Sequence, residues 1–432
     1  MRAEKTMTQS APISAESQKA AFFRNSVWLM FSNVASGMMM WGVHFLSKRI
    51  PDAEYGTLIS LLAVTILVPT IPLQMVFAQQ TAAALATGRE RQLAGMLRAA
   101  WLTTFVLWLL AVVAVVLFGN NILSAWRISN PAALWATLLV MLGALWFPMF
   151  CGVLQGQQKF LWLGWTAIFN GVGRIGSAAL IVVILGGYAA GIITGAAVGF
   201  GLAVGVAIWQ TRGVWLGQAE PFEKRGLLKQ VIPAMLGFGA YQFLFTADTI
   251  FVKTYFSPDE TAFYGGAGTL SRALVWLVGP LTAVMFPKIV HSVARGEKSN
   301  LLLLTLVCTG ALAGCGALGL WVTAPWLLKL VYKPSYIEVG LRVLPWYAFA
   351  MVPLTLGNVL VSNLLARSQF GLVPWLVALA IAYGVALTHF NQSLVMVLQT
   401  FGVSNVLLVV VCAWFTSKHK SELEREEPAS VL

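Results

Sequence analysis

Charged side chains are scarce in this sequence of 432 residues: Asp, Glu, Lys and Arg together make up 10% of it, whereas 58% is hydrophobic. A soluble domain carries roughly 25% charged residues, so the scarcity excludes an ordinary soluble fold. The apolar residues form runs long enough to cross a bilayer, whose hydrocarbon core of about 30 Å needs ~20 residues per helix. The composition therefore predicts an all-α polytopic membrane protein.

Signatures of covalent chemistry are also missing. The four cysteines lie in apolar runs without a CxxC pair, which excludes a disulfide framework and a zinc site. The sequence has no Walker loop, HExxH or GxSxG. Two GxGxxG matches, GVGRIG at 171–176 and GCGALG at 314–319, lack the strand and the later acid of a dinucleotide site and favour close helix packing. We expect no enzymatic activity, no metal, no cofactor and no direct use of ATP.

The apolar runs predict about twelve spanning helices, six in each half of the chain. Their expected limits are 24–47, 56–79, 99–118, 132–154, 163–185, 189–211, 231–253, 264–286, 300–323, 343–365, 371–389 and 393–415. The polar residues 1–22 are predicted to be a disordered N-terminus, 213–230 a linker and 416–432 a charged tail, which leaves an N-terminal lobe at 23–212 and a C-terminal lobe at 231–415.

Basic residues in the connecting segments predict the orientation. If the N-terminus is cytoplasmic, 19 of the 28 Lys and Arg residues lie on the cytoplasmic side and seven on the other. The excess favours cytoplasmic N- and C-termini, because basic loops stay inside. Basic loops facing anionic lipid also account for the net charge of +12, so no nucleic-acid partner is expected.

One short motif is written twice, about 210 residues apart. RIPDAEYGTL at 49–58 and YFSPDETAFYGGAGTL at 255–270 both contain Pro-Asp, an acid, Tyr-Gly and Thr-Leu. We interpret them as equivalent tight turns in a duplicated six-helix unit. An even number of spans keeps both copies in the same orientation, so the lobes are expected to be related by a pseudo-two-fold axis along the membrane normal, as in alternating-access transporters.

Several stretches together resemble one family of membrane proteins. They are PDAEYGTL at 51–58, GVLQGQQKF at 152–160, the segment 247–274 and the Phe-Pro pair at 286–287. The chain resembles, over residues 22–415, the O-antigen and capsule (Wzx-type) flippases of the multidrug/oligosaccharidyl-lipid/polysaccharide (MOP) exporter superfamily. The resemblance implies two six-helix lobes around a central cavity, as in MATE proteins.

The same resemblance implies a function. An undecaprenyl-pyrophosphate-linked oligosaccharide would be flipped across the bacterial inner membrane for O-antigen, capsule or exopolysaccharide synthesis, with a polysaccharide polymerase and other assembly proteins as further partners. One alternative is an ion-coupled multidrug or cation antiporter of the same superfamily. A membrane polymerase or ligase is disfavoured because the sequence has no large outer loop for catalytic residues.

Charges within the spans are the candidate functional residues, since each costs roughly 2.5–3.5 kcal/mol to insert at a helix centre. Arg174 and Arg272 are expected to bind an anionic headgroup, together with Arg24 at the inner mouth of the cavity. Asp248 is a candidate for coupling to a proton or sodium ion. Structural alternatives remain open: Arg174 held by carbonyls or a distant acid, an Asp248–Arg272 ion pair, and Arg24 reaching for the interface.

Overall fold

The computed structural model describes residues 15–294, 301–367 and 369–426, and every regular element in these ranges is a helix. The first half contains α1 (Ala15–Gly42), the 3₁₀ helix η1 (Val43–Arg49), α2 (Asp52–Ile66), α3 (Thr70–Thr87), α4 (Glu90–Ala125), α5 (Pro131–Gly156), α6 (Phe160–Leu185) and α7 (Tyr188–Gln210). After the short α8 (Arg212–Trp215), the second half contains α9 (Lys224–Tyr255), α10 (Pro258–Ala294), α11 (Leu301–Val331), η2 (Pro334–Tyr336), α12 (Ile337–Ala366), η3 (Phe370–Leu372), α13 (Val373–His389) and α14 (Leu394–Glu426).

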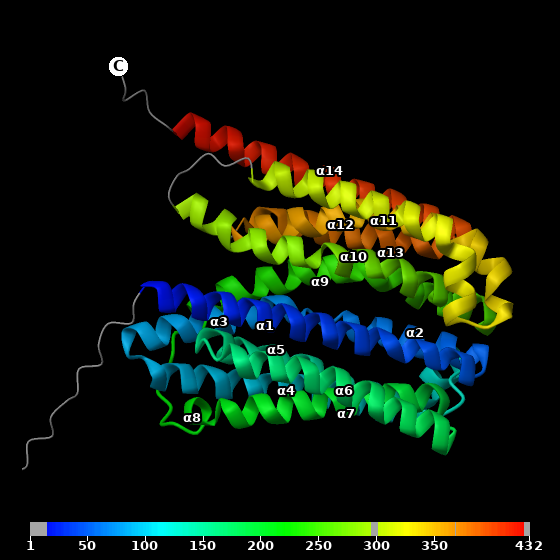
Figure 1. Cartoon of the computed structure of the whole chain (residues 1–432), viewed down its shortest axis with the longest axis horizontal. Coiled ribbons are helices and arrows are strands. Elements are labelled where there is room, and N and C mark those ends of the chain that lie inside the picture. Colours follow the sequence, from blue (N-terminus) through cyan, green and yellow to red (C-terminus); the bar gives the residue numbers. More distant parts are fainter. Residues whose placement is uncertain (1–14, 295–300, 368, 427–432) are drawn as a thin grey trace, which may run out of the picture.

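The helices form two lobes, α1–α7 and α9–α14 (Figure 1). Ten helical segments are long and apolar enough to cross a membrane, and α1 and α10 run alongside them (Figure 1). With α2 and α3 counted as one span, each lobe contributes six. The predicted all-α, MATE-like fold with about twelve spanning helices in two pseudo-symmetric lobes is confirmed.

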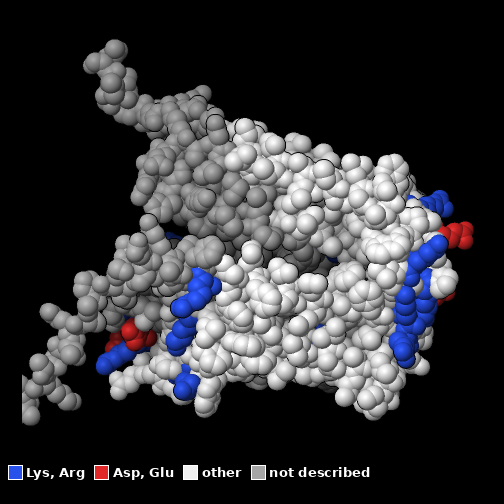
Figure 2. Space-filling model, in the orientation of Figure 1, with Lys and Arg blue, Asp and Glu red and all other residues white. Residues whose placement is uncertain are grey.

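The surface matches this topology. Many large apolar side chains, such as Leu117, Ile184 and Val322, are exposed on the outside of the helices. Figure 2 shows Lys and Arg gathered at the two ends of the helices, with a broad belt of uncharged side chains between them. An apolar belt of this kind is stable in contact with lipid chains and not with water.

The two ends of the molecule carry different connecting segments, and they are called the linker end and the hairpin end. The linker end carries residues 88–90 and 211–223, and α1 begins and α14 ends there (Figure 1). The hairpin end carries residues 43–58, 253–262 and 329–336. The largest apolar cluster draws buried side chains from both lobes, including Tyr55, Leu58 and Tyr332, whereas a smaller cluster around Phe77 and Met149 lies in the N-terminal lobe.

The second predicted span is broken. The sequence predicts one helix over 56–79, but α2 ends at Ile66 and α3 begins at Thr70. Pro69 lies in the break with an extended ψ of 90°. Proline lacks the backbone N–H that a continuous helix needs and its ring clashes with the preceding turn, which accounts for the interruption.

The polar segments at the lobe boundaries are shorter than the sequence predicts. Helix α1 already begins at Ala15, inside the segment 1–22 expected to be disordered, and residues 1–14 lie outside the described part. Helix α9 begins at Lys224, inside the expected linker 213–230. Residues of high intrinsic helix propensity dominate the stretches 15–22 and 224–230, namely Ala, Glu, Gln, Lys and Leu.

The sequence predicts that both copies of the repeated motif are tight turns. In the structure, each copy begins a helix and continues into it. In each copy the Pro-Asp pair begins a helix, and the Tyr-Gly pairs lie in the first turns of α2 and α10. Acids in the first turn complement the helix dipole. In the second copy, Ser257 and Glu260 also form a reciprocal capping box, with the backbone N–H of each bonded to the side chain of the other.

Candidate functional site

A buried ion pair occupies the interior of the C-terminal lobe. Asp248 on α9 is 0% exposed and Arg272 on α10 is 9% exposed. Nη2 of Arg272 donates to both carboxylate oxygens of Asp248, at 3.0 Å to Oδ1 and 3.2 Å to Oδ2. Asp248 and Arg272 therefore form the ion pair that the sequence left open as an alternative.

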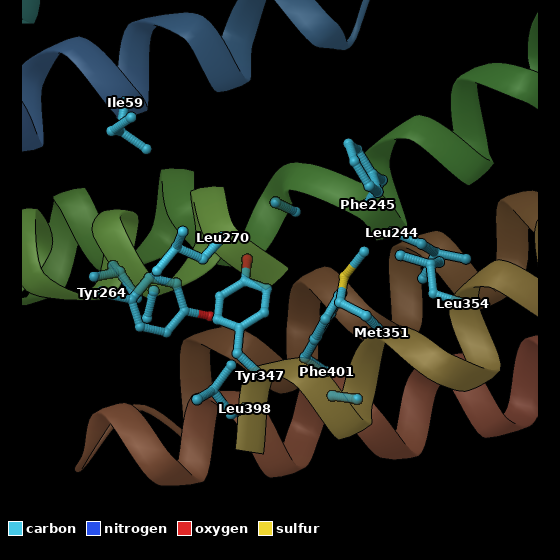
Figure 3. Packing of buried hydrophobic residues seen from close by; sticks show 14 of the residues in the cluster. Ile59, Leu244, Phe245, Tyr264, Leu270, Tyr347, Met351, Leu354, Leu398 and Phe401 are labelled. Atoms are coloured by element: carbon cyan, nitrogen blue, oxygen red, sulfur yellow. The ribbon is translucent and has the colours of Figure 1, made fainter. Parts of the chain in front are cut away.

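Two tyrosines complete the surroundings of the carboxylate. The hydroxyl of Tyr264 on α10 donates to Asp248 Oδ2 at 2.8 Å, and the hydroxyl of Tyr347 on α12 donates to the same oxygen. Figure 3 shows the rings of Tyr264 and Tyr347 lying together between α10 and α12, and their centroids are 5.2 Å apart. Oδ2 of Asp248 thus accepts hydrogen bonds from Arg272 and both tyrosines.

The guanidinium of Arg272 is held from further directions. It donates to Thr249 Oγ1 at 2.8 Å and to the carbonyl of Phe245 at 3.3 Å. It also lies over the rings of Phe245 and Tyr347, with centroids 5.4 and 5.5 Å away. Its Nε is buried without a partner among the described residues. These contacts fix Arg272 in one place and balance its charge with Asp248.

Arg174 is in a different situation. It lies in the middle of α6 in the N-terminal lobe and is 8% exposed. Within the described part of the chain its side chain makes no hydrogen bond or ion pair, and its Nε is buried without a partner. Neither the carbonyl nor the acidic partner anticipated as a structural alternative is found there. An arginine stays protonated in proteins, so this position holds a buried positive charge without a counter-ion among the described residues.

Glycines on α7 allow the close approach that places Arg174. A Cβ on Gly195 would lie 2.7 Å from the carbonyl oxygen of Arg174, and one on Gly199 would lie 2.9 Å from its backbone nitrogen. Helix α7 therefore packs directly on the α6 backbone. The GVGRIG stretch has the helix-packing role expected from the sequence, because Gly173 likewise contacts Gly199.

The third candidate cation, Arg24, lies on α1 toward the linker end, where its side chain is exposed. The structure therefore keeps the three predicted arginines apart. Arg272 is paired inside the C-terminal lobe, Arg174 is unpaired inside the N-terminal lobe, and Arg24 is on the surface.

The charge balance of the described interior is positive. Its buried cationic side chains are Arg174, Lys253 and Arg272, and its one buried carboxylate is Asp248. The sequence reading did not single out Lys253, at the end of the predicted helix 231–253, or either tyrosine of the carboxylate cluster. The repeated motif offered a signal for Tyr264. For Tyr347 the sequence offered none, because its role depends on how α12 packs on α10.

The described residues contain neither a candidate metal cluster nor a disulfide. They contain no group of three or more His, Cys, Asp or Glu side chains that could hold a metal ion. All four cysteines are free, with Cys151 and Cys412 buried and Cys308 and Cys315 exposed.

The fold of this chain is found among solved structures, although its sequence is not similar to known families. No protein-family model matches the sequence, and no curated protein matches it. Among solved structures, an inward-facing multidrug resistance MATE family transporter of the MOP superfamily is similar, with a TM-score of 0.73 and 10% identity over 92% of this chain and 96% of that one. An outward-facing structure of such a transporter has a TM-score of 0.60 and 12% identity over 94% and 96%.

A lipid flippase shares the same arrangement. The lipid II flippase MurJ in an inward closed conformation matches with a TM-score of 0.67 and 13% identity, over 91% of this chain and 87% of that chain. At such low identity the similarity establishes the fold. The chain is thus a multi-pass membrane protein with the two-lobed fold seen in MATE transporters and in MurJ.

Proposed function

We propose that this chain is a transporter that moves an undecaprenyl-pyrophosphate-linked oligosaccharide across the bacterial inner membrane by alternating access, as the Wzx-type resemblance implies. The two-lobed fold supports a transport role, and the similarity to a lipid II flippase supports a lipid-linked cargo. The cargo would serve O-antigen, capsule or exopolysaccharide synthesis. A polysaccharide polymerase and other assembly proteins would receive it on the far side.

The observation that carries the proposal is the unpaired charge of Arg174. A charge buried without a counter-ion is unfavourable for folding, so a role in function is its most direct explanation. A guanidinium can grip a phosphate through two parallel hydrogen bonds, and a pyrophosphate supplies several acceptor oxygens. The positive balance of the described interior favours such an anionic cargo over a cationic one.

The other candidate residues take separate roles in this proposal. Arg24, exposed toward the linker end, would meet the headgroup as it enters. Asp248 would couple transport to a proton or sodium ion, because adding a cation to its carboxylate weakens its attraction for Arg272. Arg272 would then respond to that change, and it would reach the cargo only when released from Asp248.

The orientation follows from the basic residues. We propose that the linker end faces the cytoplasm with both termini and that the hairpin end faces the periplasm. The two six-helix lobes would then extend over about 23–212 and 231–415. The higher TM-score with the inward-facing MATE structure, 0.73 against 0.60 for the outward-facing one, supports a conformation closed on the periplasmic side.

Reconstitution tests the proposal directly. Purified protein in liposomes would be given an undecaprenyl-pyrophosphate-linked oligosaccharide with a fluorescent sugar, and movement between leaflets would be followed with a membrane-impermeant quencher. We expect Arg174→Met to slow flipping at least tenfold at normal protein yield and Arg174→Lys to retain part of it, because the ammonium keeps the charge and loses the fork. Arg342→Met removes an exposed arginine and serves as the matched control. Wild-type flipping by Arg174→Met would refute the cationic site.

One observation favours a second candidate function. Asp248 lies among aromatic rings, and a buried acid near tyrosines suits an ion-coupled multidrug or cation antiporter. Asp248 matters in both candidates, and they differ in whether Arg174 does. An antiporter would give resistance to cationic dyes that is lost in Asp248→Asn and kept in Arg174→Met, whereas the flippase would give no dye resistance.

A further inference from the structure

We propose that the two copies of the repeated motif form a latch that closes the transport path at the hairpin end, with Gly56 and Gly265 as its contact points. The proposal rests on alternating access as proposed above and adds the device that holds one of its states. The latch comprises residues 47–59 of the N-terminal lobe with 253–266 and 329–336 of the C-terminal lobe.

The two copies pack directly on each other. A Cβ on Gly56 of the first copy would lie 2.9 Å from the carbonyl oxygen of Pro258 and 3.1 Å from the backbone nitrogen of Ala262, both in the second copy. A Cβ on Gly265 of the second copy would lie 2.9 Å from the side chain of Ile59, next to the first copy. Each glycine thus leaves a bare helix surface for the other lobe, which explains why the Tyr-Gly pair is written twice.

Polar links between the lobes surround this crossing. Lys333 Nζ lies 3.0 Å from Asp52 Oδ1 as an ion pair and also donates to the carbonyl of Ile50. Ser335 Oγ donates to the other Asp52 oxygen at 3.0 Å. The buried Lys253 donates to Thr57 Oγ1 at 2.9 Å. These bonds give the closed arrangement a defined register.

Aromatic side chains from both lobes contact one another in the middle of the latch. Tyr55 Oη is hydrogen-bonded to His44 Nδ1 at 3.0 Å on its own lobe and to Tyr332 Oη at 3.1 Å on the other. The hydroxyl of Tyr332 also bonds the carbonyl of Gly266 at 3.1 Å. The rings of Tyr332 and Tyr336 stack at 4.9 Å, and the ring of Tyr55 stands edge-on to both. All three tyrosines are buried. The hydroxyls of Tyr55 and Tyr332 bond each other in place of water, whereas that of Tyr336 has no hydrogen-bond partner among the described residues.

The side-chain bonds described at the linker end are of a different kind. Among the residues that the structure describes, the hydrogen bonds that a side chain of one lobe makes to the other lobe all lie at the hairpin end. They are those above, together with Ser47 to the carbonyl of Val331 and Lys48 to that of Lys329. At the linker end, Arg91 pairs with Glu220, and Arg98 donates to the carbonyls of Trp215 and Gly217. Those bonds hold the N-terminal lobe to the linker. Among the residues that the structure describes, the bonds between the lobes are thus concentrated at the hairpin end.

Distances between spin labels test the latch without any cargo. In a background with all four cysteines replaced by alanine, one pair would be Asn121→Cys with Gln392→Cys near the hairpin end, and the other Glu90→Cys with Ser417→Cys near the linker end. We expect Gly56→Leu to lengthen the hairpin-end distance, to shorten the linker-end distance and to raise the open population about tenfold. Gly205→Leu is the matched control, because a Cβ there meets nothing within 4 Å. Unchanged distances in folded Gly56→Leu would overturn the proposal.

A gentler variant covers the case in which Gly56→Leu does not fold. Tyr55→Phe with Lys253→Met removes two of the cross-lobe hydrogen bonds and keeps the packing volume. We expect the same opening of the hairpin end on a smaller scale, and no change in this variant would contradict the latch. Lobes that move as expected in a protein that flips no lipid-linked oligosaccharide would refute the proposed function alone. Flipping by a protein whose hairpin end stays closed would refute the latch alone.

Discussion

Arg174 and Arg272 carry the same sequence signature, a lone arginine within an apolar span, but the two lobes use them differently. Arg272 is tied to Asp248, Thr249 and a backbone carbonyl in a cluster whose charges balance. Arg174 is equally buried and has no partner in the described part of the chain. The contrast teaches that an intramembrane charge is a functional candidate only after its neighbours are known.

The largest effect on stability should come from removing one partner of the Asp248–Arg272 ion pair. Arg272→Met leaves the Asp248 carboxylate buried beside tyrosines without its cation, which costs about 3–5 kcal/mol. We expect a large drop in the thermal unfolding temperature of the detergent-solubilised protein. Adding Asp248→Asn to the same variant should recover much of the loss, since no net charge then remains buried. A double variant as unstable as the single one would show that the pair matters through packing.

Removing a hydroxyl from either tyrosine bonded to Asp248 should have the next largest effect on stability. Tyr347→Phe or Tyr264→Phe removes one donor to a charged oxygen, and a bond to a charged group contributes roughly 1.5–3 kcal/mol. We expect a clear decrease in the unfolding temperature for each variant. Tyr255→Phe, at an exposed tyrosine on α9, is the matched control and should unfold like the parent.

A third change perturbs the helix that carries Arg174 and leaves the arginine itself intact. In Gly199→Ala the new Cβ would lie 2.5 Å from the carbonyl oxygen of Asn170, so α6 and α7 must separate. Overpacking of this kind costs about 1–3 kcal/mol. Gly201→Ala on the same helix meets nothing within 4 Å and should leave the unfolding temperature unchanged. Equal melting of the two variants would mean that the α6–α7 contact is looser than described.

The smallest effect on stability is expected at Arg174. Arg174→Met removes a buried charge that has no partner among the described residues, so the unfolding temperature should be no lower than that of the parent protein, although flipping slows at least tenfold. A drop as large as that of Arg272→Met would show that Arg174 has a structural partner and would end the contrast between the two arginines.

The sequence predicted correctly those features that depend on the composition or pattern of a single segment. Apolar runs predicted the spans, and the repeated motif predicted two equivalent lobes. It did not single out Lys253, whose side chain is buried against Thr57 of the other lobe. It also missed the break near Pro69, since a proline in an apolar span is compatible with either a kinked helix or two helices.

The amino-acid sequence by itself determined that this chain lies in a membrane, that it is helical and that it is built twice. These properties follow because lipid accepts only segments whose backbone bonds are satisfied internally, and such segments can be read from composition and length. Tertiary structure alone decided which charges are paired and which glycines touch the other lobe. Those contacts join residues as far apart as Tyr55 and Tyr332, whose proximity depends on how separate helices pack.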